Sequence, residues 1–215
     1  MKLQIQHIIP VPLKEKLLKQ NSDVWNKDCV FNQSERIKIK APSGTGKTTF
    51  IHILYKLRND FEGNVLYDDK NYIDIVNDEL ANIRQQKISI VLQDLRLFPN
   101  LTAFENIELK RVMQQPLYEK EKIFEMAESL GVLPVMQQQC GLCSYGEQQR
   151  IAVIRALIQP FEWLLMDEPF SHLDEDNTAK AAKLIAGECS KRNAGFIITD
   201  LDDDENFDYS RKLNL

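Results

Sequence analysis

The sequence has little of what marks membrane-spanning, nucleic-acid-binding or secreted proteins. Its 215 residues contain no apolar run approaching the roughly 18 residues of a membrane helix, so a second chain must cross the membrane if this protein acts there. Acidic residues outnumber basic ones, 32 to 27, for a formal net charge of -5. That balance argues against a general nucleic-acid binder, which carries a basic stripe. Residues 1–7 alternate like a strand and lack the apolar core of a signal peptide.

Cysteine and histidine are also scarce. The four cysteines do not suggest a disulfide framework in a chain of this size, and we expect free thiols in a reducing compartment. Cys140 and Cys143 form a C-x-x-C pair, but no second pair and no nearby histidine completes a zinc site. The only histidines are His7, His52 and His172.

The chain does contain a glycine-rich loop between a predicted strand and a predicted helix. Residues 41–48, Ala-Pro-Ser-Gly-Thr-Gly-Lys-Thr, follow a strand-like run at 36–40 and lead into an apolar-periodic segment at 50–54. Strand, glycine loop and helix form the setting of a phosphate-binding loop, where backbone N–H groups and the helix N-terminus converge on an anion. Lys47 would reach the β- and γ-phosphates, and the Thr48 hydroxyl would ligate Mg²⁺. The residues expected around the phosphates are Ser43, Gly44, Thr45, Gly46, Lys47, Thr48 and Thr49.

Strands alternate with helices along the chain, which predicts an α/β fold with a parallel central sheet. Residues 1 to about 40 indicate short strands and turns, and the segment from about 95 to 160 is helical in character. The acidic residues at 202–205 suit the solvated start of a helix better than a cation site. Further strands are expected at 65–67, 72–74, 88–92, 163–166 and 196–199, and helices at 119–130, 147–158 and 177–192.

Two carboxylates, Asp167 and Glu168, follow the buried strand at 163–166. The carboxyl ends of strands are where α/β sheets bind ligands. Asp167 would hold Mg²⁺ through water, and Glu168 would polarise an attacking water. The competing interpretation is an acidic pair that caps a loop before Pro169; the phosphate loop upstream favours the functional interpretation.

Residues 143–150, Cys-Ser-Tyr-Gly-Glu-Gln-Gln-Arg, resemble the signature of the ATP-binding-cassette (ABC) ATPase family. That signature is Leu-Ser-Gly-Gly-Gln or -Glu, followed by Gln-Gln-Arg and a helix, and Ser144, Gly146 and residues 147–150 match it. Residues 91–107 resemble the family's Q-loop and its sequel, with Gln93 as the glutamine. Residues 167–174 resemble the Walker B end and the D-loop, with Asp174 last. The resemblance runs from about residue 3 to the C-terminus.

The resemblance implies a P-loop NTPase fold of the ABC type in a single domain, residues 1–215. A nucleotide-binding core of residues 1–94 and 161–215 would include an N-terminal antiparallel β subdomain, and residues 95–160 would form an inserted helical subdomain with the signature. The chain ends near the family's last core strand, so we expect no regulatory C-terminal domain.

The resemblance also implies ATP and Mg²⁺ as cofactors, and a mechanism. Two cassettes, as a homodimer or a heterodimer, would sandwich two ATP molecules. Ser144 and Gly146 of one chain would face the phosphate loop of the other, with Asp174 also near the nucleotide. Glu168 would activate water, Gln93 would contact Mg²⁺ or that water, and a transmembrane permease would follow the cycle. The protein would lie in the cytoplasm, on the inner face of the membrane through the permease, with no nucleic-acid partner.

Within the family, residues 99–106 and the Glu-Gln-Gln-Arg signature are most similar to the lipoprotein-releasing, macrolide-export and cell-division group. Residues 169–171, Pro-Phe-Ser, resemble importers instead, so the direction of transport and the substrate stay open. The alternative function is a non-transport, ATP-gated binding or scaffolding module. A P-loop kinase is disfavoured by the signature segment.

Three departures from the family pattern surround one γ-phosphate. Asp200 stands where the family has a histidine that contacts this phosphate, and an ionised carboxylate would repel it, which makes Asp200→His a test. Tyr145 replaces a signature glycine, and Ala41, at a glycine position, would be strained if a positive φ is needed there. We therefore expect slow hydrolysis rather than none. Trp25 is the best candidate to stack on adenine, although an ordinary core aromatic fits it equally well.

Overall fold

A five-stranded parallel sheet forms the centre of the computed structural model, which describes residues 1–215. All neighbouring strands in it run parallel. Phe196 and Ile198 belong to one hydrophobic cluster and Ile197 to another, as expected for a sheet covered on both faces. The predicted parallel core is confirmed, and its strand order is β6 (Ile88–Val91), β7 (Trp163–Asp167), β8 (Gly195–Asp200), β3 (Arg36–Lys40) and β9 (Arg211–Asn214).

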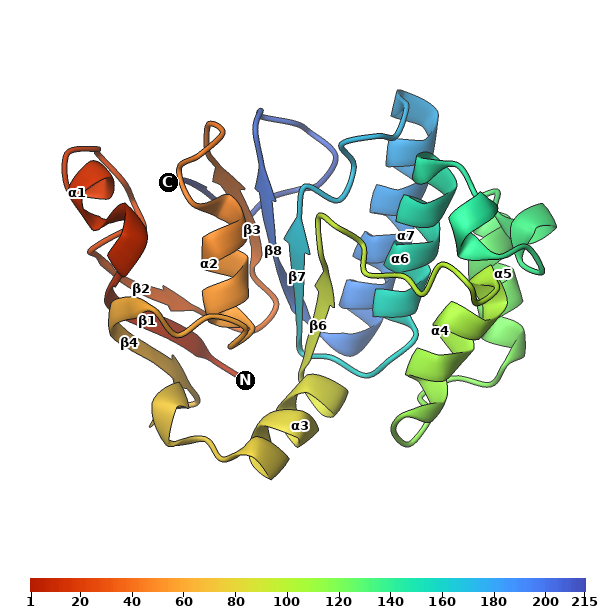
Figure 1. The fold of residues 1–215 in the computed structure, drawn as a ribbon, viewed down its shortest axis with the longest axis horizontal. Coiled ribbons are helices and arrows are strands. Elements are labelled where there is room, and N and C mark those ends of the chain that lie inside the picture. The colour runs from red at the N-terminus through yellow and green to blue at the C-terminus, as the bar shows by residue number, and fades with distance from the viewer.

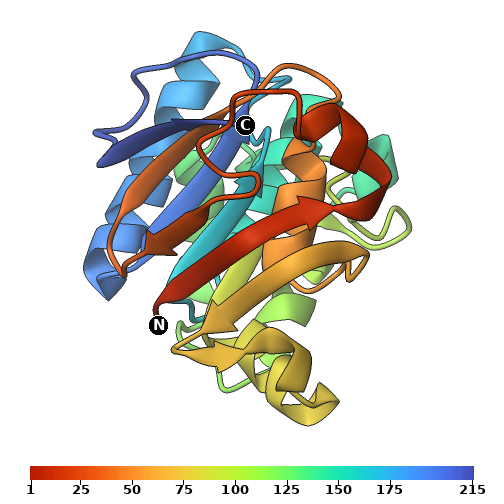
Figure 2. The same cartoon turned by 90° about the vertical axis from the view of Figure 1, so that its left-hand side faces the viewer.

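A second, antiparallel sheet faces the first across helix α2 (Lys47–Leu54), as Figures 1 and 2 show. Phe50 and Ile51 of α2 are fully buried in the same cluster as Leu3 and Ile37, which come from the two sheets. The predicted N-terminal β subdomain is thus confirmed. Its strand order is β2 (Asp28–Phe31), β1 (Leu3–Pro10), β4 (Phe61–Tyr67) and β5 (Lys70–Asn71).

Helices cover the other face of the parallel sheet. In Figure 1, α6 and α7 lie against the sheet, and α4 and α5 form the layer beyond them. A cluster of 29 buried residues joins this layer to the sheet. Helices α4 and α6 each begin in a capping box. The hydroxyl of the N-cap residue, Thr102 or Ser144, accepts from the backbone N–H of the glutamate three residues later, and that glutamate's side chain accepts from the backbone N–H of the N-cap residue. The bounds are α4 (Ala103–Val112), α5 (Glu121–Ser129), α6 (Tyr145–Leu157) and α7 (Glu175–Arg192).

The shorter elements differ from the sequence expectation in two places. Residues 72–74, predicted as a strand, form a 3₁₀ turn, because the Asn71 side chain accepts a hydrogen bond from the Ile73 N–H and caps it. A short helix, α1 (Lys14–Leu17), occurs where only strands and turns were expected. The remaining elements are α3 (Asn77–Gln86) and the 3₁₀ turns Val11–Leu13, Tyr72–Asp74, Leu133–Val135 and Cys140–Leu142.

The acidic segment at 202–205 is not the start of a helix. Asp203 pairs with Lys40 and Asp204 with Lys38, so two lysines of β3 hold this segment as a loop. The expectation of a solvated helix start was wrong because it took no account of these partners. None of the helices combines the length and the apolar character needed to cross a membrane.

Candidate active site

The loop between β3 and α2 lies at the carboxyl end of the parallel sheet (Figure 1). Gly44 and Gly46 have φ angles of 74° and 99°, in the left-handed region that strains other residues. A Cβ at Gly46 would also stand 3.0 Å from the Trp25 ring. The shape of the loop therefore requires both glycines.

A cavity of about 270 Å³ opens beside this loop and brings together residues from four parts of the chain. Thr45 does not line it, because its buried hydroxyl donates to the Pro42 carbonyl at 2.7 Å and tightens the loop from within. The lining consists of Leu13, Ser43, Gly44, Gly46, Lys47, Thr48, Thr49, Gln93 and Glu168.

Lys47 stands between the loop and the carboxylate that follows β7. Its Nζ lies 2.9 Å from the Ala41 carbonyl oxygen and 3.1 Å from Glu168 Oε1, and the two side chains are 6% and 12% exposed. A buried ammonium in this place is a strong ligand for phosphate oxygens. An incoming phosphate would replace Glu168 as its partner.

Gln93, at the end of β6, connects the loop to Glu168. Its amide Nε2 lies 3.3 Å from Glu168 Oε2, and its Oε1 accepts a hydrogen bond from the Thr48 hydroxyl at 3.3 Å. Thr48, Gln93 and Glu168 are far apart in the sequence, and the fold brings all three to the lining of the cavity.

Asp167 supplies the observation that tests whether a cation fits here. Its Oδ1 accepts from the Thr199 hydroxyl at 2.7 Å, whereas its Oδ2 is buried and has no partner. A buried carboxylate oxygen without a partner is unfavourable. Asp167 does not itself line the cavity, but it directly precedes Glu168, which does. Asp167, the Thr48 hydroxyl and the Gln93 amide oxygen offer only oxygen donors, of the kind Mg²⁺ takes along with water and phosphate. The residues present therefore fit this ion.

Glu168 occupies strained backbone. Its φ is 47°, a left-handed conformation that costs free energy in a non-glycine residue and is often found at functional sites. Its N–H donates to the Thr199 carbonyl at 3.0 Å. This bond to the end of β8 fixes the backbone of Glu168 directly after β7.

Residues 26–171 match the family model of the ABC transporter. The chain belongs to the ABC transporter family. The cassette is 31% identical over 173 residues to a lipoprotein-releasing system ATP-binding protein of Legionella pneumophila (strain Lens), covering 80% of this chain and 76% of that one. It is 31% identical over 157 residues to the cell division ATP-binding protein of Bacillus subtilis (strain 168), covering 72% and 68%.

Solved structures agree with this assignment. The dimeric structure of a bacterial ABC transporter cassette superposes with a TM-score of 0.77 at 25% identity, covering 92% of this chain and 87% of that one. A dimeric post-hydrolysis state of the same cassette, bound to ADP and phosphate, gives a TM-score of 0.78. The cassette is thus an ATP-binding and ATP-hydrolysing subunit, and its expected similarity to the lipoprotein-releasing, cell-division and macrolide-export proteins is confirmed. The non-transport alternative is not favoured.

The signature residues of the cassette lie outside the phosphate cavity. Ser144 caps α6, and its hydroxyl contacts Glu147. A Cβ at Gly146 would stand 3.2 Å from the His172 carbonyl oxygen, so glycine allows the helix to approach the turn after β7. Asp174 caps α7 by accepting from the Asn177 N–H at 2.8 Å. The structure therefore groups the loop, Gln93 and Glu168 within one chain and leaves these three residues apart from them.

The departures from the family pattern are accommodated locally. Ala41 does not have a positive φ and is fully buried, so the strain considered for it is absent. Tyr145 points into its own chain, where its O–H donates to the Gln93 carbonyl oxygen at 3.0 Å. Asp200 accepts from Lys38 Nζ at 3.1 Å, so a buried cation, which also pairs with Asp204, partly offsets the charge of this carboxylate.

Trp25 is not a stacking platform for adenine. Only 3% of it is exposed, and its Nε1–H donates to the Thr45 carbonyl oxygen at 3.1 Å. Two residues that the sequence analysis missed reach the loop from α1 and its N-cap: Leu13 lines the cavity, and Lys16 Nζ donates to the Gly44 carbonyl oxygen at 2.8 Å. The helical spacing of Leu13 and Leu17 was the one sequence signal for this cover.

Proposed function

We propose that this cassette binds Mg²⁺–ATP on the loop at 41–49 and hydrolyses it slowly to drive a membrane permease. The observation that carries the proposal is the convergence of Lys47, Gln93 and Glu168 on one cavity at the carboxyl ends of the parallel strands. Through the permease the cassette would sit in the cytoplasm on the inner face of the membrane.

Each group has a separate task in the transfer of a phosphoryl group to water. Lys47 would balance the charge of the β- and γ-phosphates. Glu168 would take the proton of the attacking water, and Gln93, whose amide donates to Glu168, would orient that water. Thr48, Asp167 and Gln93 would hold Mg²⁺, which supplies charge neutralisation at the phosphate oxygens.

Slow turnover is proposed because the γ-phosphate has one donor fewer than the family provides. Position 200 carries an aspartate whose carboxylate is bound by Lys38, so it cannot donate to a phosphate. Loss of a single donor to a developing charge lowers kcat by about 10²–10³ in well-studied enzymes. Lys47 and Glu168 are both present, so hydrolysis is slowed and not abolished.

The test is phosphate release by the purified cassette with Mg²⁺–ATP. The wild type should turn over slowly, Glu168→Gln should lose at least a further roughly 10²-fold, and Lys47→Ala should bind ATP more weakly. A wild-type rate typical of transport cassettes would refute the slow turnover. Full activity in Glu168→Gln would refute the role of Glu168.

The active form is proposed to be a dimer that completes each ATP site from the second chain. Ser144, Gly146 and Asp174 lie outside the cavity of their own chain, which leaves them available to a partner's nucleotide. Light scattering on Glu168→Gln should show dimers with ATP and monomers without it. Monomers at saturating ATP would favour a heterodimer over a homodimer.

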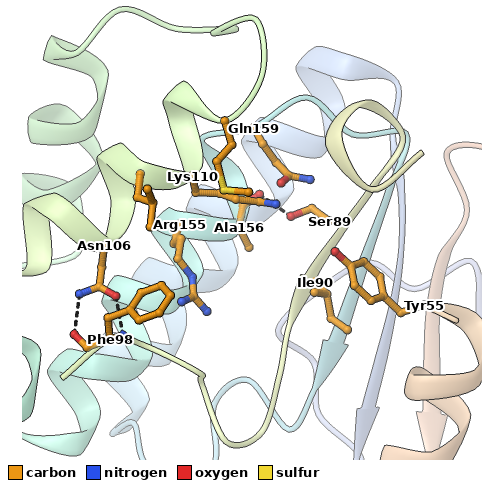
Figure 3. Close-up of a pocket in the computed structure, with 11 residues that line it drawn as sticks. Tyr55, Ser89, Ile90, Phe98, Asn106, Lys110, Arg155, Ala156 and Gln159 are labelled. Atoms are coloured by element: carbon orange, nitrogen blue, oxygen red, sulfur yellow. Dashed lines mark hydrogen bonds between the residues drawn. The ribbon is translucent and has the colours of Figure 1, made fainter. Parts of the chain in front are cut away.

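The permease is proposed to bind a groove where residues 95–160, taken as the helical subdomain, meet the core of residues 1–94 and 161–215. A cavity of about 160 Å³ lies there between α4, α6 and the strand β6, shown in Figure 3. Its lining includes Tyr55, Ser89, Phe98, Asn106, Lys110 and Arg155. Phe98 and Met113 at this groove are 54% and 56% exposed, so apolar surface surrounds the polar floor.

The groove carries cations without a carboxylate. Burial, and then the positive charges of Arg155 and Arg84, lower the pKa of Lys110. Burial likewise lowers the pKa of Arg155, which donates to the carbonyl oxygens of Leu95 and Arg96 and to no acidic side chain. The occupant that fits is an amphipathic segment of the permease with apolar side chains and one carboxylate.

Charge reversal tests this surface. Lys110→Glu should lower recovery of the permease with the cassette from membranes, and the permease-stimulated ATPase rate, by about tenfold or more, with the basal rate unchanged. Lys183→Glu, on α7 away from the groove, is the matched control and should behave as wild type. Equal recovery with both variants would exclude the groove as the docking surface.

A further inference from the structure

Helix α6 reaches two catalytic positions from one of its faces. Tyr145 and Gln149 are four residues apart in α6, so their side chains lie one turn apart on the same face. The Tyr145 O–H donates to the backbone oxygen of Gln93 at 3.0 Å. The Gln149 amide lies 3.3 Å from the backbone oxygen of Glu168, to which it donates.

Gln149 spans the turn that begins at Glu168. Its Nε2 lies 3.3 Å from Ser171 Oγ as well as from the Glu168 oxygen, and its Oε1 accepts from the His172 N–H at 3.2 Å. Only 2% of Gln149 is exposed. One buried amide therefore ties both ends of a turn whose first residue has strained backbone, with a φ of 47°. Such backbone persists only where its surroundings hold it.

Tyr145 is held by the same turn that Gln149 spans. Its ring centroid lies 4.4 Å from that of His172, with the planes tilted by 58°. The ring thus packs on one end of the turn while its hydroxyl holds the backbone of Gln93. A glycine at this position would make neither contact, so this connection belongs to this chain because it has tyrosine here.

We propose that Tyr145 and Gln149 are positioning residues for hydrolysis, through which α6 sets the places of Gln93 and Glu168. The proposal rests on the proposed function, in which those two side chains act on the attacking water. Neither positioning residue touches the cavity that receives the phosphates. Their loss should therefore slow the chemical step and leave ATP binding intact, because misplacement of a catalytic group by about 1 Å lowers rates by up to 10²-fold.

The experiment compares Gln149→Met and Tyr145→Phe with matched controls in ATPase and nucleotide-binding assays. Gln148→Met changes the neighbouring glutamine, whose amide donates only to the Cys143 carbonyl oxygen. Tyr118→Phe removes a phenol that contacts Glu188, away from the cavity. We expect kcat to fall about tenfold in Gln149→Met and about threefold in Tyr145→Phe. The KM for ATP and the Kd of a fluorescent ATP analogue should change less than about twofold, and the controls should match the wild type.

A fall in kcat that is matched by Gln148→Met, or accompanied by an equal rise in KM and a lower melting temperature, would mean a structural role and overturn the proposal. Tyr145→Phe removes one oxygen from a side chain that is 42% exposed, so it decides the question alone if Gln149→Met does not fold: an unchanged kcat refutes the proposal.

A parallel series in Glu168→Gln separates this proposal from the one on which it rests. If Glu168→Gln keeps the wild-type kcat, the role of Glu168 in the proposed function is wrong. If it loses turnover, Gln149→Met should add no further loss in that background, because the group it positions is already gone. Tyr145→Phe should still lower the residual single-turnover rate through Gln93; an additive loss from Gln149→Met would refute the assignment of Gln149 to Glu168.

Discussion

Lys38, Asp200 and Asp204 form a cluster of charges at the end of β8, where the Ala41 N–H of the phosphate loop donates to the Asp200 carbonyl oxygen. The Lys38 side chain is fully buried in β3, and its Nζ lies 3.1 Å from Asp200 Oδ2 and also contacts Asp204. The Tyr209 O–H donates to Asp204 at 2.6 Å. One ammonium shared by two carboxylates leaves a net negative charge, so the repulsion of phosphate expected from Asp200 is reduced but not removed. The sequence placed Lys38 in a strand-like run at 36–40, but neither its burial nor its partners, more than 160 positions away, could be predicted from it.

Lys38→Met should destabilise the cassette by about 3–5 kcal/mol, since removing one member of a buried ion pair leaves its partners uncompensated. Lys40→Met is the matched control, because Lys40 and Asp203 make the same kind of pair while 40% and 57% exposed, where solvent screens the charges. Urea unfolding at neutral pH measures both variants. Equal losses would contradict the burial argument.

The same cluster gives the cassette an acid-sensitive contribution to stability. Burial alone would raise the pKa of Asp204, but hydrogen bonds from Lys38 and Tyr209 outweigh it and leave this pKa below its ordinary value. A carboxyl with a lowered folded-state pKa stabilises the fold above its unfolded-state pKa, and that contribution is lost as the pH falls through the folded-state pKa. Unfolding free energies measured from pH 7 to pH 3 should therefore decline less in Asp204→Asn than in the wild type.

Asp200→His should not restore fast hydrolysis. The side chain at position 200 lies beside the buried Lys38, so an imidazole there would lose the ion pair and meet a cation. We expect a lower melting temperature and a kcat no higher than that of the wild type. A clear rise in kcat, measured by phosphate release, would show that this side chain reaches the phosphate after all.

At the scale of elements, the phosphate loop is supported by two segments of the chain that precede it. The Trp25 Nε1–H donates to the Thr45 carbonyl oxygen, and Lys16 of α1 donates to the Gly44 carbonyl oxygen. These contacts fix two carbonyls of the loop and so direct its N–H groups toward the cavity. The loop itself could be predicted from its glycines and lysine. Its supports could not, because Trp25 and Lys16 carry no motif and become neighbours of the loop only through the fold.

Trp25→Phe should weaken ATP binding, because it leaves the Thr45 carbonyl without its donor. A buried carbonyl that loses its partner costs about 1–3 kcal/mol. Trp163→Phe is the matched control: Trp163 donates its Nε1–H to the Met1 carbonyl oxygen at 2.8 Å, at the far end of the strands. Both variants should melt at lower temperature, but only Trp25→Phe should raise the Kd for ATP. An equal Kd in both would refute the supporting role of Trp25.

The elements with strong local sequence signals formed where the sequence predicted them. Elements whose conformation depends on a single side chain could not be predicted. The continuous apolar runs of β6, β7 and β8 lie where predicted, because buried parallel strands depend on hydrophobicity alone. Residues 72–74 have the composition of a strand but form a 3₁₀ turn, because the Asn71 side chain caps it. Glu168 was predicted from its place after a buried strand and Gln93 from a family motif. The inward direction of Tyr145 could not be predicted, because it depends on His172 and Gln93, which are distant in sequence.

For the molecule as a whole, the reactivity of the four cysteines toward thiol reagents measures how often the fold opens. All four are free and buried. Burial raises the pKa of Cys140 to about 11 and that of Cys189 to about 12, so almost no reactive thiolate exists at pH 8 in the folded state. Cys189, on α7, is 1% exposed and lies in the main cluster of 29 residues. Its labelling therefore requires the cluster to open.

ATP should slow the labelling of Cys189 by thiol reagents by a factor of one plus the ratio of the ATP concentration to its Kd. In Glu168→Gln, which preserves the nucleotide, ATP at ten times its Kd should slow labelling at pH 8 about tenfold, since a ligand that binds only the folded state stabilises it by mass action. Labelling followed by mass spectrometry gives the rate for each cysteine, and all four should react rapidly in urea. A rate for Cys189 that does not respond to ATP would mean that α7 opens without the nucleotide site.

Arg155 links the groove to the segment that follows Gln93 in the ATP cavity. Its guanidinium lines the groove and also holds the carbonyls of Leu95 and Arg96, two residues with positive φ that follow Gln93. A partner that distinguishes between arrangements of this segment must change ATP affinity, and ATP must change the partner's affinity by the same factor. A partner indifferent to the segment would bind, however tightly, without altering the ATP site. If a permease binds the groove as proposed, the effect it can have on ATP affinity is limited by its preference for one placement of residues 93–96, and not by how tightly it binds.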